Sequence, residues 1–328
     1  MMPTSVNTLA VDLDRSLEGN SQAARDLLAR LISDDPETQT QTAEMLEDTR
    51  EPEVWRLLLE VLAVHTWRGN PTPVAEAAGQ DPKRLAFSIR GLFCSLAETP
   101  AQPAKIAVLK EALDHRDPNI GHHAALLLGR RGDAAALPAL VDMLNSGDEV
   151  WAIQAANVLG EQGYSQAADA LVGAIAGDLP CLHRAAAQAL QEMGSPAVPT
   201  LIRALQHPDN HVRWHAARAL GKIGTPEAIP VLIQTLEDVD SGVRWLAGEA
   251  LIHIGDEILE PLFENLAYKP INAFRRTSTI HVLRRFESEG LREVTPTIQA
   301  LRTVDYATLT PMAAYEVLQE LYRIKSSR

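Results

Sequence analysis

Residues 209–224 read D-N-H-V-R-W-H-A-A-R-A-L-G-K-I-G, a stretch that predicts one amphipathic helix with its own beginning and end. Asp209 is typical of a helix N-cap, because its carboxylate can accept a hydrogen bond from a free backbone N–H of the first turn. Gly224 can adopt the left-handed conformation that ends a helix. Between these two residues the apolar positions recur at helical spacing, at Val212, Ala216, Ala219, Leu220 and Ile223.

The same pattern returns along the chain at a nearly constant interval. The closing glycines lie 31, 31, 30 and 31 residues apart, at Gly132, Gly163, Gly194, Gly224 and Gly255. The opening aspartates follow at intervals of 31, 30, 31 and 31, at Asp117, Asp148, Asp178, Asp209 and Asp240. A fixed period of this length predicts an array in which each repeat buries its apolar face against its neighbours.

A second amphipathic helix is expected in each period, at residues 135–144, 166–175, 197–205, 228–236 and 257–266. Prolines mark the start of four of these helices, because proline is tolerated in a first helical turn: Pro138, Pro199, Pro230 and Pro261. The sequence therefore predicts an all-α fold built from helix pairs.

We expect three parts along the chain. Residues 1–34 form N-terminal capping helices, and residues 303–328 form a C-terminal capping helix and tail. The array fills residues 35–302, with degenerate repeats at 35–116 and 268–302 and regular repeats at 117–267. An irregular stretch at 66–83 is either sequence drift near the end of the array or a loop on its binding face.

The alternation of x-A-x-P-x-L-I-x-x-L with D-x-x-V-R-x-x-A-A-x-A-L-G-x-I-G resembles HEAT repeats, in the subclass named after phycobilisome lyases. This resemblance covers residues 35–301. It implies a right-handed α-solenoid of about seven to eight helix pairs with a period of about 31, whose second helices line a concave surface. Members of the subclass include bilin lyase subunits, chaperone-like factors and scaffolds, so the resemblance alone leaves the activity open.

Composition narrows the class of partner. The net charge is -13 over 328 residues, which disfavours general binding to nucleic acid or to an anionic membrane, because phosphate contacts need an excess of Lys and Arg. The two cysteines, Cys94 and Cys181, lie in different repeats and fit a reducing compartment better than a disulfide framework. We find no signal-peptide pattern and no membrane-spanning stretch, and expect a cytoplasmic protein.

Candidate contacts lie at helix positions that the repeat does not require to be apolar. The position of Trp214 reads His122, Ile153, Arg184, Trp214 and Trp245 in successive repeats. Two tryptophans in adjacent repeats, with arginine nearby, are typical of binding hot spots, although each ring could instead pack against the next repeat. We therefore predict a partner-binding face that contains Trp214, Trp245, His215, Arg218, Arg184 and His122.

Arg213 and Arg244 share another position, four residues after Asp209 and Asp240. The resemblance implies that these four residues form a structural ladder of Asp and Arg between repeats. A guanidinium exposed beside a tryptophan could instead bind a carboxylate of a partner.

Basic residues concentrate between 269 and 292, where Arg275, Arg276, Arg284 and Arg285 are candidates for a patch that binds an acidic partner. A solvated helix face would have the same composition.

Catalytic chemistry has no support in the sequence. His211 and His215 are spaced i, i+4, but two imidazoles do not make a metal site, and the chain holds no His-Glu pair of the kind that binds iron in the HEAT-like deoxyhypusine hydroxylases. Nucleophile and phosphate-loop signatures are also missing. We therefore predict no catalytic residues, no metal and no cofactor.

Three functions follow from these observations. We expect a non-enzymatic scaffold or adaptor that binds a protein or peptide on the concave surface. The alternative, which the resemblance implies, is a bilin lyase or a phycobiliprotein chaperone-like factor. The third is nucleic-acid binding through the basic patch at 269–292, which the acidic net charge disfavours.

Overall fold

The computed structural model describes residue 56, residues 103–116 and residues 118–326. The expected capping helices at 1–34 and the stretch at 66–83 lie outside the described residues, as does most of the degenerate array expected at 35–116. The chain divides into two compact units, residues 1–158 and 159–328, and each is described by itself.

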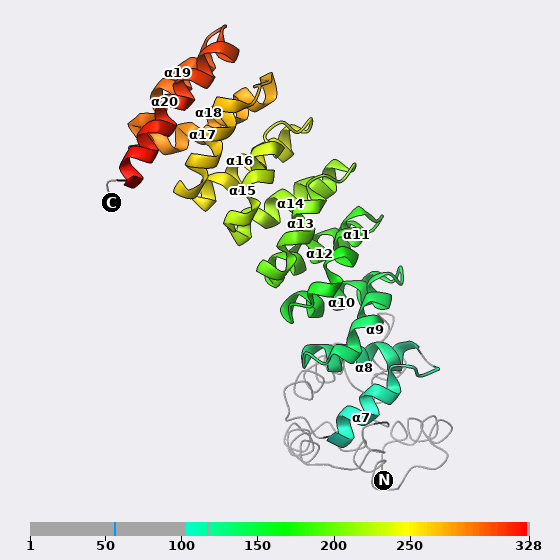
Figure 1. Cartoon of the computed structure of the whole chain (residues 1–328). Coiled ribbons are helices and arrows are strands. Elements are labelled where there is room, and N and C mark those ends of the chain that lie inside the picture. The colour runs from blue at the N-terminus through cyan, green and yellow to red at the C-terminus, as the bar shows by residue number, and fades with distance from the viewer. Residues whose placement is uncertain (1–55, 57–102, 117, 327–328) are drawn as a thin grey trace, which may run out of the picture. The chain divides into compact units, whose positions relative to one another are not determined.

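Every regular element among the described residues is a helix, as the sequence predicts. The α-helices, labelled as in Figure 1, are α7 (Pro103–Ala112), α8 (Pro118–Arg130), α9 (Leu137–Leu144), α10 (Glu149–Glu161), α11 (Ala168–Ala176), α12 (Pro180–Met193), α13 (Val198–Ala204), α14 (Asn210–Ile223), α15 (Ile229–Thr235), α16 (Ser241–Ile254), α17 (Leu259–Tyr268), α18 (Ala273–Ser288), α19 (Thr295–Arg302) and α20 (Tyr306–Ser326). A single 3-10 turn precedes each odd-numbered helix from α9 to α19: Ala134–Ala136, Ser165–Ala167, Ser195–Ala197, Pro226–Ala228, Asp256–Ile258 and Arg292–Val294.

The unit 159–328 is a succession of antiparallel helix pairs that follow one another in chain order (Figure 1). Helix α11 packs on α12, α13 on α14, and α15 on α16. The second helices also pack on one another, α12 on α14, α14 on α16, and α16 on α18. The last helix, α20, packs on α17 and α19. This two-layer arrangement is that of an α-solenoid.

Both predicted ends of the central helix α14 are confirmed. The carboxylate of Asp209 accepts a hydrogen bond of 2.8 Å from the backbone N–H of His211. Gly224 has a φ of 69° and ends the helix in the left-handed region, and its N–H donates to the carbonyl oxygen of Leu220 at 2.9 Å. Asp240 caps α16 in the same way, through the N–H groups of Gly242 and Val243.

The core follows the repeat pattern. One leucine of each second helix, eleven or twelve residues after the opening aspartate, is completely buried, at Leu128, Leu159, Leu190, Leu220 and Leu251. Many of the other buried residues are alanines, so this core needs few aromatic side chains.

Glycine allows the second helices to approach one another closely. A Cβ atom added to Gly160, near the end of α10, would lie 2.5 Å from Cα and 2.8 Å from Cβ of Ala189 in α12. The equivalent Gly221 of α14 meets Ala250 of α16 in the same way, at 3.0 Å from its Cβ and 3.2 Å from its Cα. The backbone of one helix therefore fills the space that a side chain of the other would need.

Replacement of Gly160 by alanine should lower the free energy of unfolding by about 2 kcal/mol, because the new methyl group overlaps backbone atoms that cannot move independently. The matched control is Gly173→Ala in α11, where an added Cβ meets no atom within 4 Å. At this site alanine should raise the free energy of unfolding by about 0.5 to 1 kcal/mol, because alanine has fewer backbone conformations than glycine in the unfolded chain. Urea denaturation of both variants measures these changes, and equal effects at the two sites would contradict the close approach.

Candidate functional site

The exposed side of the second helices in the unit 159–328 carries residues at three positions spaced i, i+4, so that they lie on one side of each helix. We call this face the second-helix surface. Its residues are Arg184, Gln188 and Glu192 of α12; Trp214, Arg218 and Lys222 of α14; Trp245, Glu249 and His253 of α16; and Thr277, His281 and Arg285 of α18. All of them are exposed or half-exposed.

The two tryptophans of this surface have different surroundings. Trp245 is 56% exposed. Trp214 is half-buried, and its ring edge faces Gly242 of α16, where an added Cβ would lie 3.3 Å from Cδ1 of the indole. The guanidinium of Arg218 lies over the Trp214 ring at 5.4 Å from its centroid, in a cation–π contact. Trp214 thus contributes to packing between repeats, while Trp245 presents most of its ring to solvent.

The expectation that His215 is exposed is wrong. The residue is 9% exposed, and its buried Nδ1 atom has no hydrogen-bond partner among the described residues. The ring lies edge-on to Trp214, with centroids 4.9 Å apart, and to His211, at 4.6 Å. His215 therefore supports the Trp214 ring from beneath. The equivalent residues Ala185 and Leu246 already indicated a position of small or apolar side chains.

A row of histidine rings continues from His215 toward α12. His183 lies edge-on to His211, with centroids 4.9 Å apart, and its Nε2 atom lies 2.7 Å from the carbonyl oxygen of Gly177. Burial, and to a smaller extent the positive charges of His211, His183 and Arg218, together lower the pKa of His215 to about 4. No group of three or more His, Cys, Asp or Glu side chains among the described residues is placed to hold a metal ion.

Stability should fall in acid because of His215. Its pKa of about 4 in the folded chain lies below the value of about 6.5 in the unfolded chain, so the unfolded state binds more protons between these pH values. The free energy of unfolding should fall by about 2 to 3 kcal/mol as the pH drops from 7.5 to 4.5, beyond the fall caused by other groups. Above pH 7.5 this histidine makes no difference.

The comparison that isolates this effect is His215→Leu, since leucine occupies the equivalent position 246 of the next helix. The variant keeps His183, His211 and Arg218, so these three side chains are present in both proteins. Urea denaturation at pH 7.5 and 4.5 should give a smaller acid loss for the variant than for the wild type. Equal losses would show that His215 titrates normally.

Arg213 connects consecutive repeats, but with a different partner from the one expected. Its Nε and Nη2 atoms donate to the two carboxylate oxygens of Asp238 at 2.7 and 2.9 Å, and this hydrogen bonding raises the pKa of the arginine. Its Nη1 atom donates to the carbonyl oxygens of His207 and Pro208, both at 2.9 Å. The expected partners Asp209 and Asp240 instead cap helices.

Arg244, at the equivalent position of α16, holds the preceding turn through hydrogen bonds to the carbonyl oxygens of Asp238 and Val239, at 2.7 and 3.0 Å. Its guanidinium lies over the ring of Phe274 in the next repeat, 4.5 Å from the centroid. Asp240 also receives a hydrogen bond of 2.9 Å from the side-chain amide of Asn210. The arginine and aspartate positions thus fix the turns between helices.

Removal of the Asp238 carboxylate should lower the free energy of unfolding by about 3 kcal/mol, because Arg213 would remain buried without its counter-charge. The side chains of this pair are only 11% and 10% exposed. The control is Asp169→Ala, since Asp169 pairs with Arg203 at 2.7 Å while 75% of its side chain is exposed. That change should have little effect, because solvent screens the pair. Thermal unfolding compares the two, and similar losses would contradict a structural role specific to Asp238.

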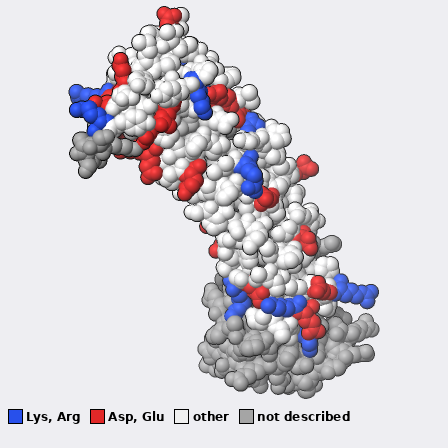
Figure 2. Space-filling view, in the orientation of Figure 1, with Lys and Arg blue, Asp and Glu red and all other residues white. Residues whose placement is uncertain are grey.

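The predicted basic patch does not form a single surface. Arg275 is 2% exposed and pairs with Glu237 at 2.8 Å, and burial lowers its pKa. Arg276 donates to the carbonyl oxygen of Leu301 at 2.6 Å and lies over the ring of Tyr306. Arg284 and Arg285 are exposed, and Arg285 pairs with Glu289 at 2.8 Å. On the face drawn in Figure 2, the described Lys and Arg side chains are scattered among Asp and Glu.

In the unit 1–158, the candidate His122 lies in a cluster of rings. It is half-buried, with its centroid 4.9 Å from that of Trp151, and the buried His123 lies 5.0 Å from the same ring. Trp151 is 4% exposed and belongs to the core. The remaining candidate, Arg184, is exposed on α12.

Comparison with known proteins gives a family for the central part of the chain. The family described as HEAT repeats matches residues 106–180 and 178–252. This match covers residues 106–252, which are 147 of the 328 residues. The second-helix surface begins within the matched residues and continues beyond them onto α18. No curated protein matches the chain.

Two solved structures are similar to this chain at 18% identity. Human deoxyhypusine hydroxylase in complex with glycerol matches over 81% of this chain and 96% of its own, with a TM-score of 0.30. The complex of CpcE and CpcF of phycocyanin lyase from Nostoc sp. PCC7120 matches over 92% of this chain and 96% of that chain, also with a TM-score of 0.30. These identities and TM-scores are too low to assign an activity to this chain.

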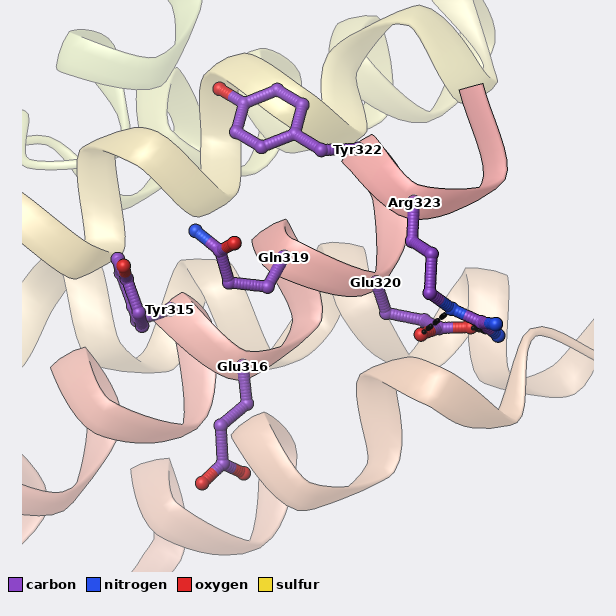
Figure 3. A pocket seen from close by; sticks show the side chains of 6 residues that line it. All are labelled: Tyr315, Glu316, Gln319, Glu320, Tyr322 and Arg323. Carbon is purple, nitrogen blue, oxygen red and sulfur yellow. Dashed lines mark hydrogen bonds and ion pairs between the residues drawn. The ribbon is translucent and has the colours of Figure 1, made fainter. Parts of the chain in front are cut away.

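A shallow hollow on α20, beyond the matched HEAT repeats, was not indicated by the sequence pattern (Figure 3). It is lined by Tyr315, Glu316, Gln319, Glu320, Tyr322 and Arg323, all from one helix. The hydroxyl of Tyr322 donates to the carboxylate of Glu264 in α17 at 3.0 Å, and this hydrogen bond raises the pKa of the tyrosine to about 12. Within the hollow, Glu320 pairs with Arg323 at 2.7 Å.

Among the residues that the structure describes, no helix combines the length and the apolar content needed to cross a membrane.

Proposed function

We propose that this HEAT-repeat chain is a non-enzymatic scaffold that binds a protein or peptide partner on its second-helix surface, the face expected to be concave. The observation that carries this proposal is the pair of tryptophans in adjacent repeats. Trp245 is 56% exposed beside the half-exposed Trp214, which carries Arg218 on its ring. Tryptophan and arginine are the residue types that dominate binding energy at protein interfaces.

Rigidity of the surface supports the same proposal. Helices α14 and α16 begin at aspartate caps, Gly221 of α14 contacts α16, and Arg213 donates a hydrogen bond to the turn before α14. A surface that is ordered before binding loses little conformational entropy when a partner docks. HEAT repeats, which stack into extended binding faces, commonly mediate interactions between proteins.

A bilin lyase or phycobiliprotein chaperone-like factor is the second candidate, and it rests on the resemblance to the subclass of HEAT repeats named after phycobilisome lyases. The indoles of Trp214 and Trp245 offer faces to a tetrapyrrole, and the exposed Arg184 and Arg218 offer partners for its propionates. Phycocyanobilin mixed with the purified chain should then show a shifted absorption band. An unchanged spectrum would remove this candidate.

The scaffold proposal is tested by replacing both Trp214 and Trp245 with alanine. Affinity capture from a lysate of the source organism, read by quantitative mass spectrometry, should recover the partner with the wild type. Recovery with the double variant should fall by at least about tenfold, because two hot-spot side chains are removed.

The matched control for this experiment is the variant Tyr268→Ala with Met312→Ala. These side chains are 69% and 63% exposed but lie on α17 and α20, away from the second-helix surface. The control should retain the partner, and thermal unfolding should show that both variants are folded. Equal capture by the wild type and the tryptophan variant would contradict the proposal.

A further inference from the structure

We propose that the second-helix surface selects partners in which acidic side chains stand next to an apolar anchor residue, that is, an acidic peptide segment. This inference rests on the proposed function and adds the chemical class of the partner. It follows from the charges that surround the two tryptophans.

Helix α14 presents two cations beside Trp214. Arg218 and Lys222 are exposed and spaced i, i+4, and neither forms an ion pair with any described residue. Arg218 is held over the indole of Trp214, 5.4 Å from the ring centroid, which leaves the N–H groups of its guanidinium available to a carboxylate. In the neighbouring helix α12, Arg184 adds a third exposed cation at the position equivalent to Trp214.

The acidic groups of the same surface are already engaged. Glu249 of α16 lies 2.8 Å from Nε2 of His281 on α18. Glu192 of α12 accepts a hydrogen bond of 2.8 Å from the side-chain amide of Gln188. Arg184, Arg218 and Lys222 are the cations of this surface that have no ion-pair partner among the described residues, whereas Arg285 pairs with Glu289.

For a short bound segment, the charges close to it matter more than the net charge of the whole chain. The whole chain carries a net charge of -13, which repels a long polyanion. Salt screens charges beyond about 8 Å at physiological ionic strength, so a short segment on α14 senses mainly Arg218 and Lys222. A short acidic peptide thus experiences attraction at a site where nucleic acid, which extends over acidic regions, is disfavoured.

Geometry sets the pattern within the segment. Residues spaced i, i+4 on a helix have Cβ atoms about 6 Å apart, so the two cations of α14 suit two nearby carboxylates of a partner. An apolar side chain in the same segment would lie against the two tryptophans. Trp214 is one helical turn from Arg218 on α14, and Trp245 is at the equivalent position of the next repeat. Charge would orient the segment, and burial of the apolar side chain would supply most of the binding energy.

The test is a selection of random peptides displayed on phage, with the full-length chain as the immobilised target. Wild-type protein should enrich peptides that combine Asp or Glu with an aromatic or aliphatic residue. The variant Arg218→Glu with Lys222→Glu should lose this acidic bias. A selected peptide, labelled with fluorescein, should bind the variant at least about tenfold more weakly in fluorescence anisotropy, and its affinity for the wild type should fall with added NaCl.

A charge-matched control separates local from general electrostatics. The variant Lys269→Glu with Arg292→Glu changes the net charge by the same amount, at exposed residues outside the second-helix surface. It should bind the selected peptide as the wild type does. Equal loss in both variants would show that the attraction is not local, and would overturn this inference.

The remaining outcomes distinguish this inference from the proposed function. Enriched peptides that need Trp214 and Trp245 but carry no acidic bias would overturn the acidic preference and leave the scaffold proposal standing. If the selection enriches no peptide beyond the level found with an unrelated protein as the target, both the scaffold proposal and the acidic preference are contradicted. A single-stranded oligonucleotide that binds through Arg218 and Lys222, more tightly than the selected peptides, would replace the acidic peptide by nucleic acid.

Discussion

The close approach of consecutive second helices is the constraint on which the rest of the array depends. Gly160 meets the backbone of α12 at Ala189, and Gly221 meets α16 at Ala250, so that the helices are nearly in backbone contact at these points. Because no side chain can lie between them there, the side chains on the outer faces of the helices are brought into aligned rows. The second-helix surface is the consequence of this spacing.

Turns between the helices are fixed by a separate set of contacts. Asp209 and Asp240 cap α14 and α16, while Arg213 and Arg244 hold the turns through backbone carbonyl oxygens. The polar groups of these four residues therefore form their hydrogen bonds within the array. Arg218 and Lys222 are used by neither the core nor the turns, and Trp214 packs on α16 only at its ring edge, so these three positions can differ between repeats and provide specificity.

The periodicity of the sequence explains why the helices could be predicted, while the contacts of the long side chains could not. The caps at Asp209 and Gly224 and the buried leucines depend on spacing within one helix, and these predictions are confirmed. The pairing of Arg213 with Asp238 and the burial of Arg275 depend on where the neighbouring repeat places its turn. A repeat pattern shows which residues occupy equivalent positions. It does not show how each helix is rotated relative to the next helix.

His215 shows how such a buried position still affects the surface above it. Its ring supports Trp214, and burial keeps its pKa near 4, so the ring is neutral at physiological pH. A protonated imidazole there would repel Arg218, which lies over the same indole. The neutral histidine therefore lets the indole hold a guanidinium on its ring while the ring edge packs on α16. Trp214 thereby positions Arg218, whereas Trp245, which is mostly exposed, is left to bury its surface against a partner.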